Sequence, residues 1–148
     1  MSHYLVNQLI HVMWSTKNLH YQFQKSLKSD LLAYITTIIK SKNGRVLATG
    51  GFSDHIHLLI VLPPEISLSL LLGHVKAYSS KWIKSCEHID PEFSWQEGYL
   101  AVSTQEDKLS SICRYIEGEE SRHQSLSYLD EVTSILKQQN IRFNKDYL

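Results

Sequence analysis

The stretch Gly51-Phe52-Ser53-Asp54-His55-Ile56-His57-Leu58-Leu59-Ile60-Val61-Leu62 is the most informative part of this chain. An apolar run rich in branched residues follows Gly50-Gly51 and ends before Pro63-Pro64, which is typical of a turn followed by a strand. Strand side chains alternate between the two faces of a sheet, so we expect His55 and His57 to project to the same side. Two imidazoles placed in this way can provide two ligands to a divalent metal ion.

The histidine pair is not a complete site by itself. The chain contains eight histidines, so one His-x-His arrangement can also arise by chance. Two histidines that only faced a core would still need hydrogen-bond partners. A third ligand and a reactive group must come from elsewhere in the sequence, and their identity determines the function.

Length and composition indicate an ordinary folded protein. A chain of 148 residues is expected to form a single domain over residues 1–148, and its 43% hydrophobic and 20% charged residues argue against disorder. Cys86 and Cys113 lack the spacing of a zinc ribbon or a disulfide framework. No apolar run approaches the ~20 residues of a membrane span, and the N-terminus lacks a signal-peptide core, which together predict a cytoplasmic protein.

Charge is unevenly distributed although the net charge is zero. Residues 1–84 carry nine Lys or Arg and three Asp or Glu, whereas residues 85–148 carry six and twelve. Such an asymmetry fits a basic binding face on one half of the protein, and it fits equally well two halves that pair with each other.

Hydrophobic periodicity and turn residues predict the order of elements. We expect strands within residues 4–16, at 45–49, at 55–62 and at 99–103, and helices at 23–40, from the N-cap Ser67 to about 86, from a Ser103–Glu106 capping box to about His123, and at 128–138. This order indicates the α+β class, as a ferredoxin-like βαββαβ sandwich with an additional C-terminal helix, which carries Tyr115.

The helix after Ser67 carries Lys76, Ser80 and Lys84 at intervals of four residues, which predicts one exposed polar row. Most rows of this kind are only solvated. Lysines interleaved with hydroxyls also suit DNA phosphates, so these three residues and Arg45 are the predicted DNA-binding residues.

Tyr115 and Glu119 lie four residues apart, so they share one face of their predicted helix. With His55 and His57, Glu119 would complete a set of N, N and O ligands that suits Mg²⁺ or Mn²⁺. A phenol beside a metal-polarised phosphodiester can attack phosphorus and form a phosphotyrosine. The alternative is that Tyr115 is an ordinary half-buried core residue.

Five segments occur in an order that resembles a known family. They are Trp14–Lys17, Asp54–Leu59, Lys76–Trp82, Trp95–Tyr99 with Ala101–Ser103, and Tyr115-Ile116 eight residues before His123. Over about residues 8–125 the chain resembles the HUH single-tyrosine transposases of small insertion sequences and the related REP-associated tyrosine transposases.

The resemblance implies a ferredoxin-like fold, a metal pair at His55 and His57, a catalytic Tyr115, and cleavage and rejoining of single-stranded hairpin DNA. It also implies a homodimer in which the tyrosine helix of one subunit serves the histidines of the other, although some REP-associated members are monomeric.

The chain departs from the family pattern close to the tyrosine. Gly118-Glu119 stands where the family usually has Asn-Gln, and Arg122-His123 where it often has His-His. The family's third metal ligand is the Gln of that pair, so Glu119 is the matching residue. Gly118 inside a helix is expected to mark a bend just after Tyr115.

The sequence therefore predicts a metal-dependent transposase that cuts single-stranded DNA. Two alternatives stay open at this point. One is a domesticated module that binds DNA hairpins without cutting them, and the other is a small metal-dependent hydrolase that has no DNA partner.

Overall fold

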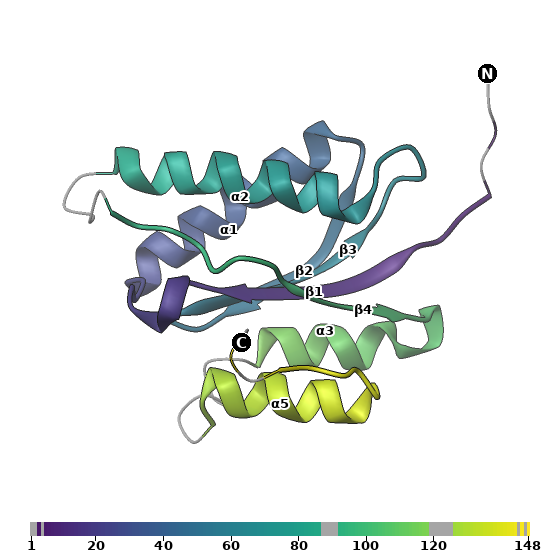
Figure 1. Ribbon diagram of the computed structural model, residues 1–148. Coiled ribbons are helices and arrows are strands. Elements are labelled where there is room, and N and C mark those ends of the chain that lie inside the picture. The colour runs from purple at the N-terminus through teal and green to yellow at the C-terminus, as the bar shows by residue number, and fades with distance from the viewer. Residues whose placement is uncertain (1–2, 4, 87–91, 119–125, 145, 147) are drawn as a thin grey trace.

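The structure is a computed structural model that describes residues 3, 5–86, 92–118, 126–144, 146 and 148. Its centre is a four-stranded antiparallel sheet in the order β2-β3-β1-β4, which confirms the predicted ferredoxin-like arrangement (Figure 1). No helix in these ranges is long and apolar enough to cross a membrane. The strands are β1 Leu9–Ser15, β2 Arg45–Gly51, β3 His55–Val61 and β4 Leu100–Thr104; the helices are α1 Lys25–Ser41, α2 Leu68–Ser85, α3 Leu109–Glu117 and α5 Tyr128–Gln138, with short 3-10 helices at Lys17–Leu19 and Glu106–Lys108.

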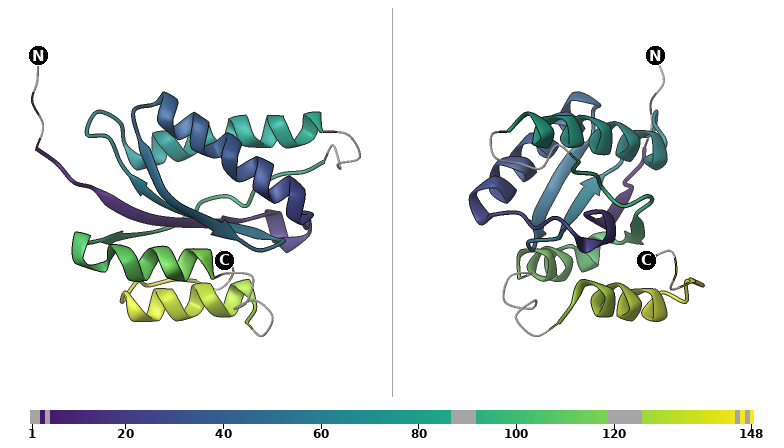
Figure 2. Two further views of the ribbon diagram at one scale, coloured as in Figure 1. Left: turned by 180° about the vertical axis from the view of Figure 1, so that it is seen from behind. Right: turned by 60° about the vertical axis from the view of Figure 1, so that its left-hand side comes forward.

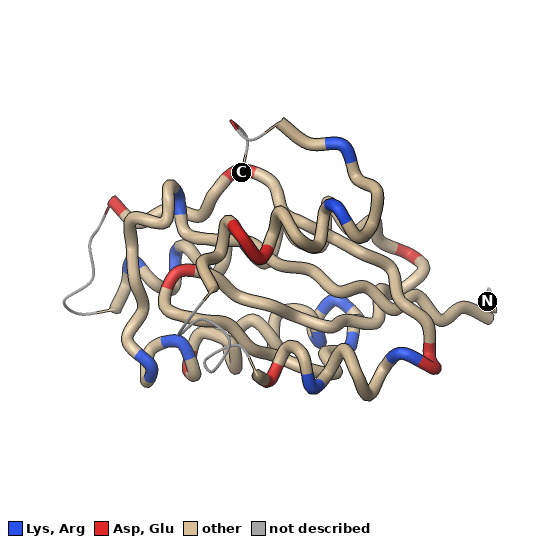
Figure 3. The backbone as a smooth tube through the Cα atoms, turned by 90° about the horizontal axis from the view of Figure 1, so that it is seen from below, with Lys and Arg blue, Asp and Glu red and all other residues tan. Residues whose placement is uncertain are grey.

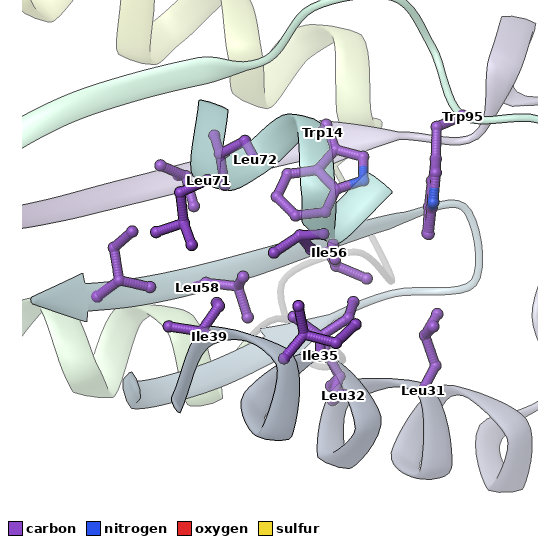
Figure 4. Packing of buried hydrophobic residues seen from close by; sticks show 14 of the residues in the cluster. Trp14, Leu31, Leu32, Ile35, Ile39, Ile56, Leu58, Leu71, Leu72 and Trp95 are labelled. Atoms are coloured by element: carbon purple, nitrogen blue, oxygen red, sulfur yellow. The ribbon is translucent and has the colours of Figure 1, made fainter. Parts of the chain in front are cut away.

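Helices cover both faces of the sheet, with α1 and α2 on one face and α3 and α5 on the other (Figure 2). The larger core lies under α1 and α2, where Trp14 and Ile56 pack against residues such as Ile35 (Figure 4). Met13, the neighbour of Trp14, belongs to a second core with α5. Strand alternation therefore divides the chain into two chemically different faces.

Two helix starts are confirmed by their capping contacts. The hydroxyl of Ser67 accepts from the amide of Leu70 at 3.1 Å, and the hydroxyl of Ser127 accepts from the amide of Asp130 at 3.2 Å. Each serine satisfies one of the amides that a first helical turn leaves without a partner. These two caps fix the N-terminal ends of α2 and α5.

The predicted capping box after the fourth strand is wrong. Ser103 remains in β4, where it pairs with Ile10 of β1, and α3 begins only at Leu109 without a side-chain cap. The helix ends at Glu117 with Gly118 as its C-cap residue. The predicted continuation to His123 falls on residues 119–125, outside the described part of the chain.

Charge separates between the two helical layers. The lysines of α1 and α2 are Lys25, Lys28, Lys40, Lys76, Lys81 and Lys84, and Asp30 is the acidic residue of these helices. The other layer is mixed: it carries the acidic residues Glu106, Asp107, Glu117, Asp130 and Glu131 and the basic residues Lys108, Arg114 and Lys137, and Figure 3 views the charges from this side. The layers lie on opposite faces of the sheet, so this arrangement favours a basic surface over two halves that pair.

The position of α3 depends on a glycine in β2. A Cβ added to Gly50 would overlap the main-chain carbonyl of Ile116, which means that the backbone of α3 lies directly on the strand. Gly50 is also the β-sheet partner of His57. This close contact therefore holds Tyr115, the residue before Ile116, above the histidine strand.

Replacing Gly50 with alanine should lower the free energy of unfolding by about 1–3 kcal/mol, because the added methyl group must push α3 away from the sheet. Gly73 on α2 is the matched control, since a Cβ there meets nothing within 4 Å. Gly73→Ala should stabilise the protein by up to about 1 kcal/mol through helix propensity. Urea unfolding of both variants measures the difference; equal stability of Gly50→Ala and wild type would contradict this account of α3.

Candidate active site

His55 and His57 lie on one face of β3, on the side that α3 and α5 cover. Both side chains are fully buried, and their ring centroids are 5.2 Å apart. The shared face follows from strand alternation, as predicted. Full burial means that each ring nitrogen needs a partner inside the protein.

The third member of the cluster is Glu131, which α5 contributes. Its Oε1 atom is 3.1 Å from Nε2 of His57 and 3.5 Å from Nε2 of His55, and its side chain is 1% exposed. One ligand atom from each of the three residues lies within 4.8 Å of the others. These three side chains can therefore form a metal site.

The other nitrogen of each imidazole has its own partner. Nδ1 of His55 is 2.7 Å from Oδ1 of Asp54, and Nδ1 of His57 is 2.7 Å from Nε2 of His11. Both Nε2 atoms consequently face the carboxylate of Glu131. Metal-binding histidines usually have such a partner on the nitrogen that does not bind the metal, because it fixes the ring orientation and the tautomer.

Tyr115 joins the same cluster from α3. Its hydroxyl donates a 2.6 Å hydrogen bond to Oε2 of Glu131, and its ring lies edge-on to His57 with centroids 6.0 Å apart. Glu131 thus contacts the tyrosine with one oxygen and the histidines with the other. All of these groups belong to a single chain.

A cavity of about 620 Å³ opens beside this cluster between β4, α3 and α5. Tyr115, Glu131 and His11 line this cavity together with apolar side chains such as Ile112 and Ile135. Tyr115 is therefore open to a ligand in the cavity, whereas His55 and His57 are buried behind it.

Tyr128 is a second tyrosine at the site, but its environment is different. Its ring packs against His55 at 4.7 Å, and its hydroxyl donates to Oε1 of Gln96 at 2.9 Å. Burial raises the pKa of the Tyr128 phenol well above its usual value; a hydrogen bond with Ser15 opposes this shift, and nearby carboxylates add to it. A phenol that resists ionisation is a poor nucleophile, which favours Tyr115 as the reactive tyrosine.

Glu131 and His11 were not predicted as site residues. Glu131 lies on the buried face of α5 with Tyr128, Val132 and Leu136, so a carboxylate on an apolar helix face was the available signal. Glu119, the predicted third ligand, lies outside the described residues. Among those that the structure describes, Glu131 takes the place beside Tyr115 and the histidines.

The predicted DNA-binding row lies on α2, across the sheet from Tyr115. Lys76 is half-buried, and its amino group donates to the carbonyls of Gln96, at 2.8 Å, and Gly98. Burial lowers the pKa of Lys76, and the nearby Glu97 carboxylate opposes the shift. Lys76 thus holds the loop that carries Gln96, while Lys84 and Arg45 are exposed and Ser80 is half-buried.

Comparison with known proteins places these features in context. The chain is 28% identical over 80 residues to the transposases for insertion sequence element IS200 of Salmonella typhimurium and Salmonella typhi. The aligned segment is 54% of this chain and 53% of each relative, so the chain spans about half the length of these curated relatives.

Two solved structures share the fold. A candidate transposase from Deinococcus radiodurans R1 has a TM-score of 0.62 and 20% identity, with 78% of this chain and 93% of that chain covered. A REP-associated tyrosine transposase bound to a REP hairpin has a TM-score of 0.63 and 15% identity, with 85% and 76% covered. The sequence model of the family described as "Transposase IS200 like" matches residues 4–119, and the chain therefore belongs to this family of IS200-like transposases.

Proposed function

We propose that this protein is a metal-dependent single-strand DNA transposase that cleaves and rejoins hairpin DNA through a phosphotyrosine at Tyr115. One observation carries the proposal: the Tyr115 hydroxyl, the Glu131 carboxylate and the two histidines form one connected cluster, and Tyr115 and Glu131 line an open cavity. Membership of the IS200-like family supports the DNA substrate. The structural relative bound to a REP hairpin suggests what form that DNA takes.

His55, His57 and Glu131 are the residues that would hold the metal ion. Their donor set of two imidazole nitrogens and one carboxylate oxygen fits Mg²⁺ or Mn²⁺, and both Nε2 atoms face Glu131. Such a cation, when bound, acts as a Lewis acid on an oxygen of the phosphodiester.

Tyr115 would supply the nucleophile, and Glu131 is placed to receive its proton. The phenol already donates its hydrogen to Oε2, so transfer of that proton requires no rearrangement. The phenolate oxygen would form the new bond to phosphorus while the bond to one sugar oxygen breaks. Attack by a sugar oxygen on the phosphotyrosine reverses the step and rejoins the strand, which conserves the energy of the phosphodiester.

The two helical layers would divide the contacts with DNA. The cavity beside Tyr115 is the place for the strand that is cut, because Tyr115 lines it. On the opposite layer Lys84 and Ser80 of α2 would contact phosphates, and Arg45 at the start of β2 would add a further contact, whereas the amino group of Lys76 is already bound to carbonyl oxygens.

The wild-type protein, mixed with a labelled single-stranded hairpin and Mn²⁺, should retain the label after denaturation. Tyr115→Phe should abolish this adduct and keep hairpin binding, because only the hydroxyl is lost. Tyr128→Phe should still form the adduct, since the Tyr128 phenol resists ionisation. An adduct that maps to Tyr128 would contradict the assignment of the nucleophile, and wild type that binds but never forms one would indicate the non-cleaving module.

The same assay separates a site within one chain from a site shared between subunits. Tyr115→Phe mixed with His57→Ala should form no adduct, because Tyr115 and His57 meet within one chain. Recovery of the adduct in the mixture would show that the tyrosine helix serves a second subunit, as the homodimer implied by the resemblance requires.

Replacing Glu131 with glutamine should weaken Mn²⁺ binding by more than about 10-fold, the lower end of the loss seen for outer-shell partners of metal sites. Glu119→Gln is the matched control, because it also removes one negative charge, at the position of the family's third metal ligand. We expect it to change the affinity for Mn²⁺ little. Isothermal titration of both variants measures this difference. The reverse result, with Glu119→Gln the weaker binder, would make Glu119 the third ligand.

Lys84→Ala should weaken hairpin binding. It should also reduce the slope of log affinity against log salt concentration by roughly 0.7, which is the contribution of one phosphate contact with a single strand. Lys137→Ala is the control, because Lys137 is an exposed lysine on α5 in the other layer. Filter binding across a salt series provides the slopes. Equal slopes for Lys84→Ala and wild type would exclude α2 as the DNA surface.

A further inference from the structure

His11 is a buried histidine beside the cluster, and the proposed reaction does not use it. It lies on β1, the strand next to β3, and its side chain is 7% exposed. Its ring stacks on that of His57 with centroids 5.0 Å apart and an interplanar angle of 22°. Its Nε2 atom is 2.7 Å from Nδ1 of His57, which is a short hydrogen bond in a buried setting.

This hydrogen bond restricts the proton of His57. A neutral imidazole has one protonated nitrogen and one nitrogen with a free lone pair. Binding of a cation through Nε2 requires the lone pair there, so the hydrogen of His57 must be on Nδ1. That hydrogen points to Nε2 of His11, which must then act as the acceptor.

Asp54 has the corresponding position for His55, since its carboxylate can only accept from Nδ1 of that ring. The two metal-binding histidines would therefore be oriented by two different acceptors, a carboxylate from the adjacent residue and an imidazole from the neighbouring strand. The imidazole of His11 would accept the hydrogen of His57 without adding a negative charge beside the site where the DNA phosphate would bind.

We propose that His11 is a positioning residue that keeps the hydrogen of His57 on Nδ1 and thereby leaves Nε2 of His57 available to the divalent cation. The inference rests on the metal site of the proposed function, and it concerns the binding step and not the chemistry at Tyr115.

A matched pair of substitutions separates this role from simple packing. His11→Phe preserves a flat ring that can stack on His57 but removes the acceptor. His11→Gln loses the ring but has an amide oxygen that can accept from Nδ1. A packing role predicts that Phe is the better replacement, whereas the positioning role predicts that Gln is.

The experiment titrates wild type, His11→Phe and His11→Gln with Mn²⁺ in the absence of DNA. Electron paramagnetic resonance measures the concentration of the free ion at each step. His11→Phe should weaken binding by about 10- to 100-fold, the usual effect of losing an outer-shell partner, and His11→Gln should remain close to wild type. Thermal unfolding without metal checks that both variants fold. Equal affinity of His11→Phe and wild type, or equal losses in the two variants, would overturn the proposal.

A second measurement determines the tautomer of His57 directly, and its result does not depend on how stable the variants are. Long-range ¹H–¹⁵N spectra with Mg²⁺ should show the hydrogen of His57 on Nδ1 in wild type; finding it on Nε2 would overturn the proposal. Wild type that binds no Mn²⁺ would overturn the metal site and this inference together. If wild type and His11→Phe bind Mn²⁺ with equal affinity, the inference about His11 is overturned while the metal site stands.

Discussion

The buried carboxylate of Glu131 is the group on which the arrangement of this site depends. A carboxylate that is 1% exposed is costly unless its oxygens have partners. Here one oxygen faces the two imidazoles, and the other accepts from Tyr115. Three separate elements, β3, α3 and α5, therefore meet at a single functional group.

The tyrosine reaches this carboxylate because α3 lies unusually close to the sheet. Gly50 allows the carbonyl of Ile116 to approach β2, and Gly50 is paired with His57 in the neighbouring strand. The position of Tyr115 and the position of the histidine strand are thus fixed by the same backbone contact. The glycine at position 50 in β2 thus determines how closely Tyr115 approaches the histidines.

The sheet also separates two kinds of surface. The face under α1 and α2 is a large apolar core, and these helices carry the clustered lysines. The face under α3 and α5 has smaller apolar clusters, between which lie the histidines, Glu131 and the cavity. The sheet thus separates the clustered lysines of α1 and α2 from the buried histidines and Glu131.

The sequence by itself determined what depends on local geometry. Strand alternation put His55 and His57 on one face, the Ser67 cap fixed the start of α2, and the order of elements predicted the ferredoxin-like sheet. The prediction of Glu119 as a metal ligand also used a local relation, its separation of four residues from Tyr115, and it stays a prediction because Glu119 lies outside the described residues.

Only the tertiary structure decided that Glu131 and His11 lie beside the two histidines. Periodicity shows that Glu131 is on the buried face of α5, but it does not show that this face lies over β3. His11 likewise meets His57 only through the pairing of β1 with β3. Pairing with β1 also keeps Ser103 in β4, so that α3 begins only at Leu109. These contacts join residues far apart in the chain, and their geometry is set by packing and strand register, which no local pattern contains.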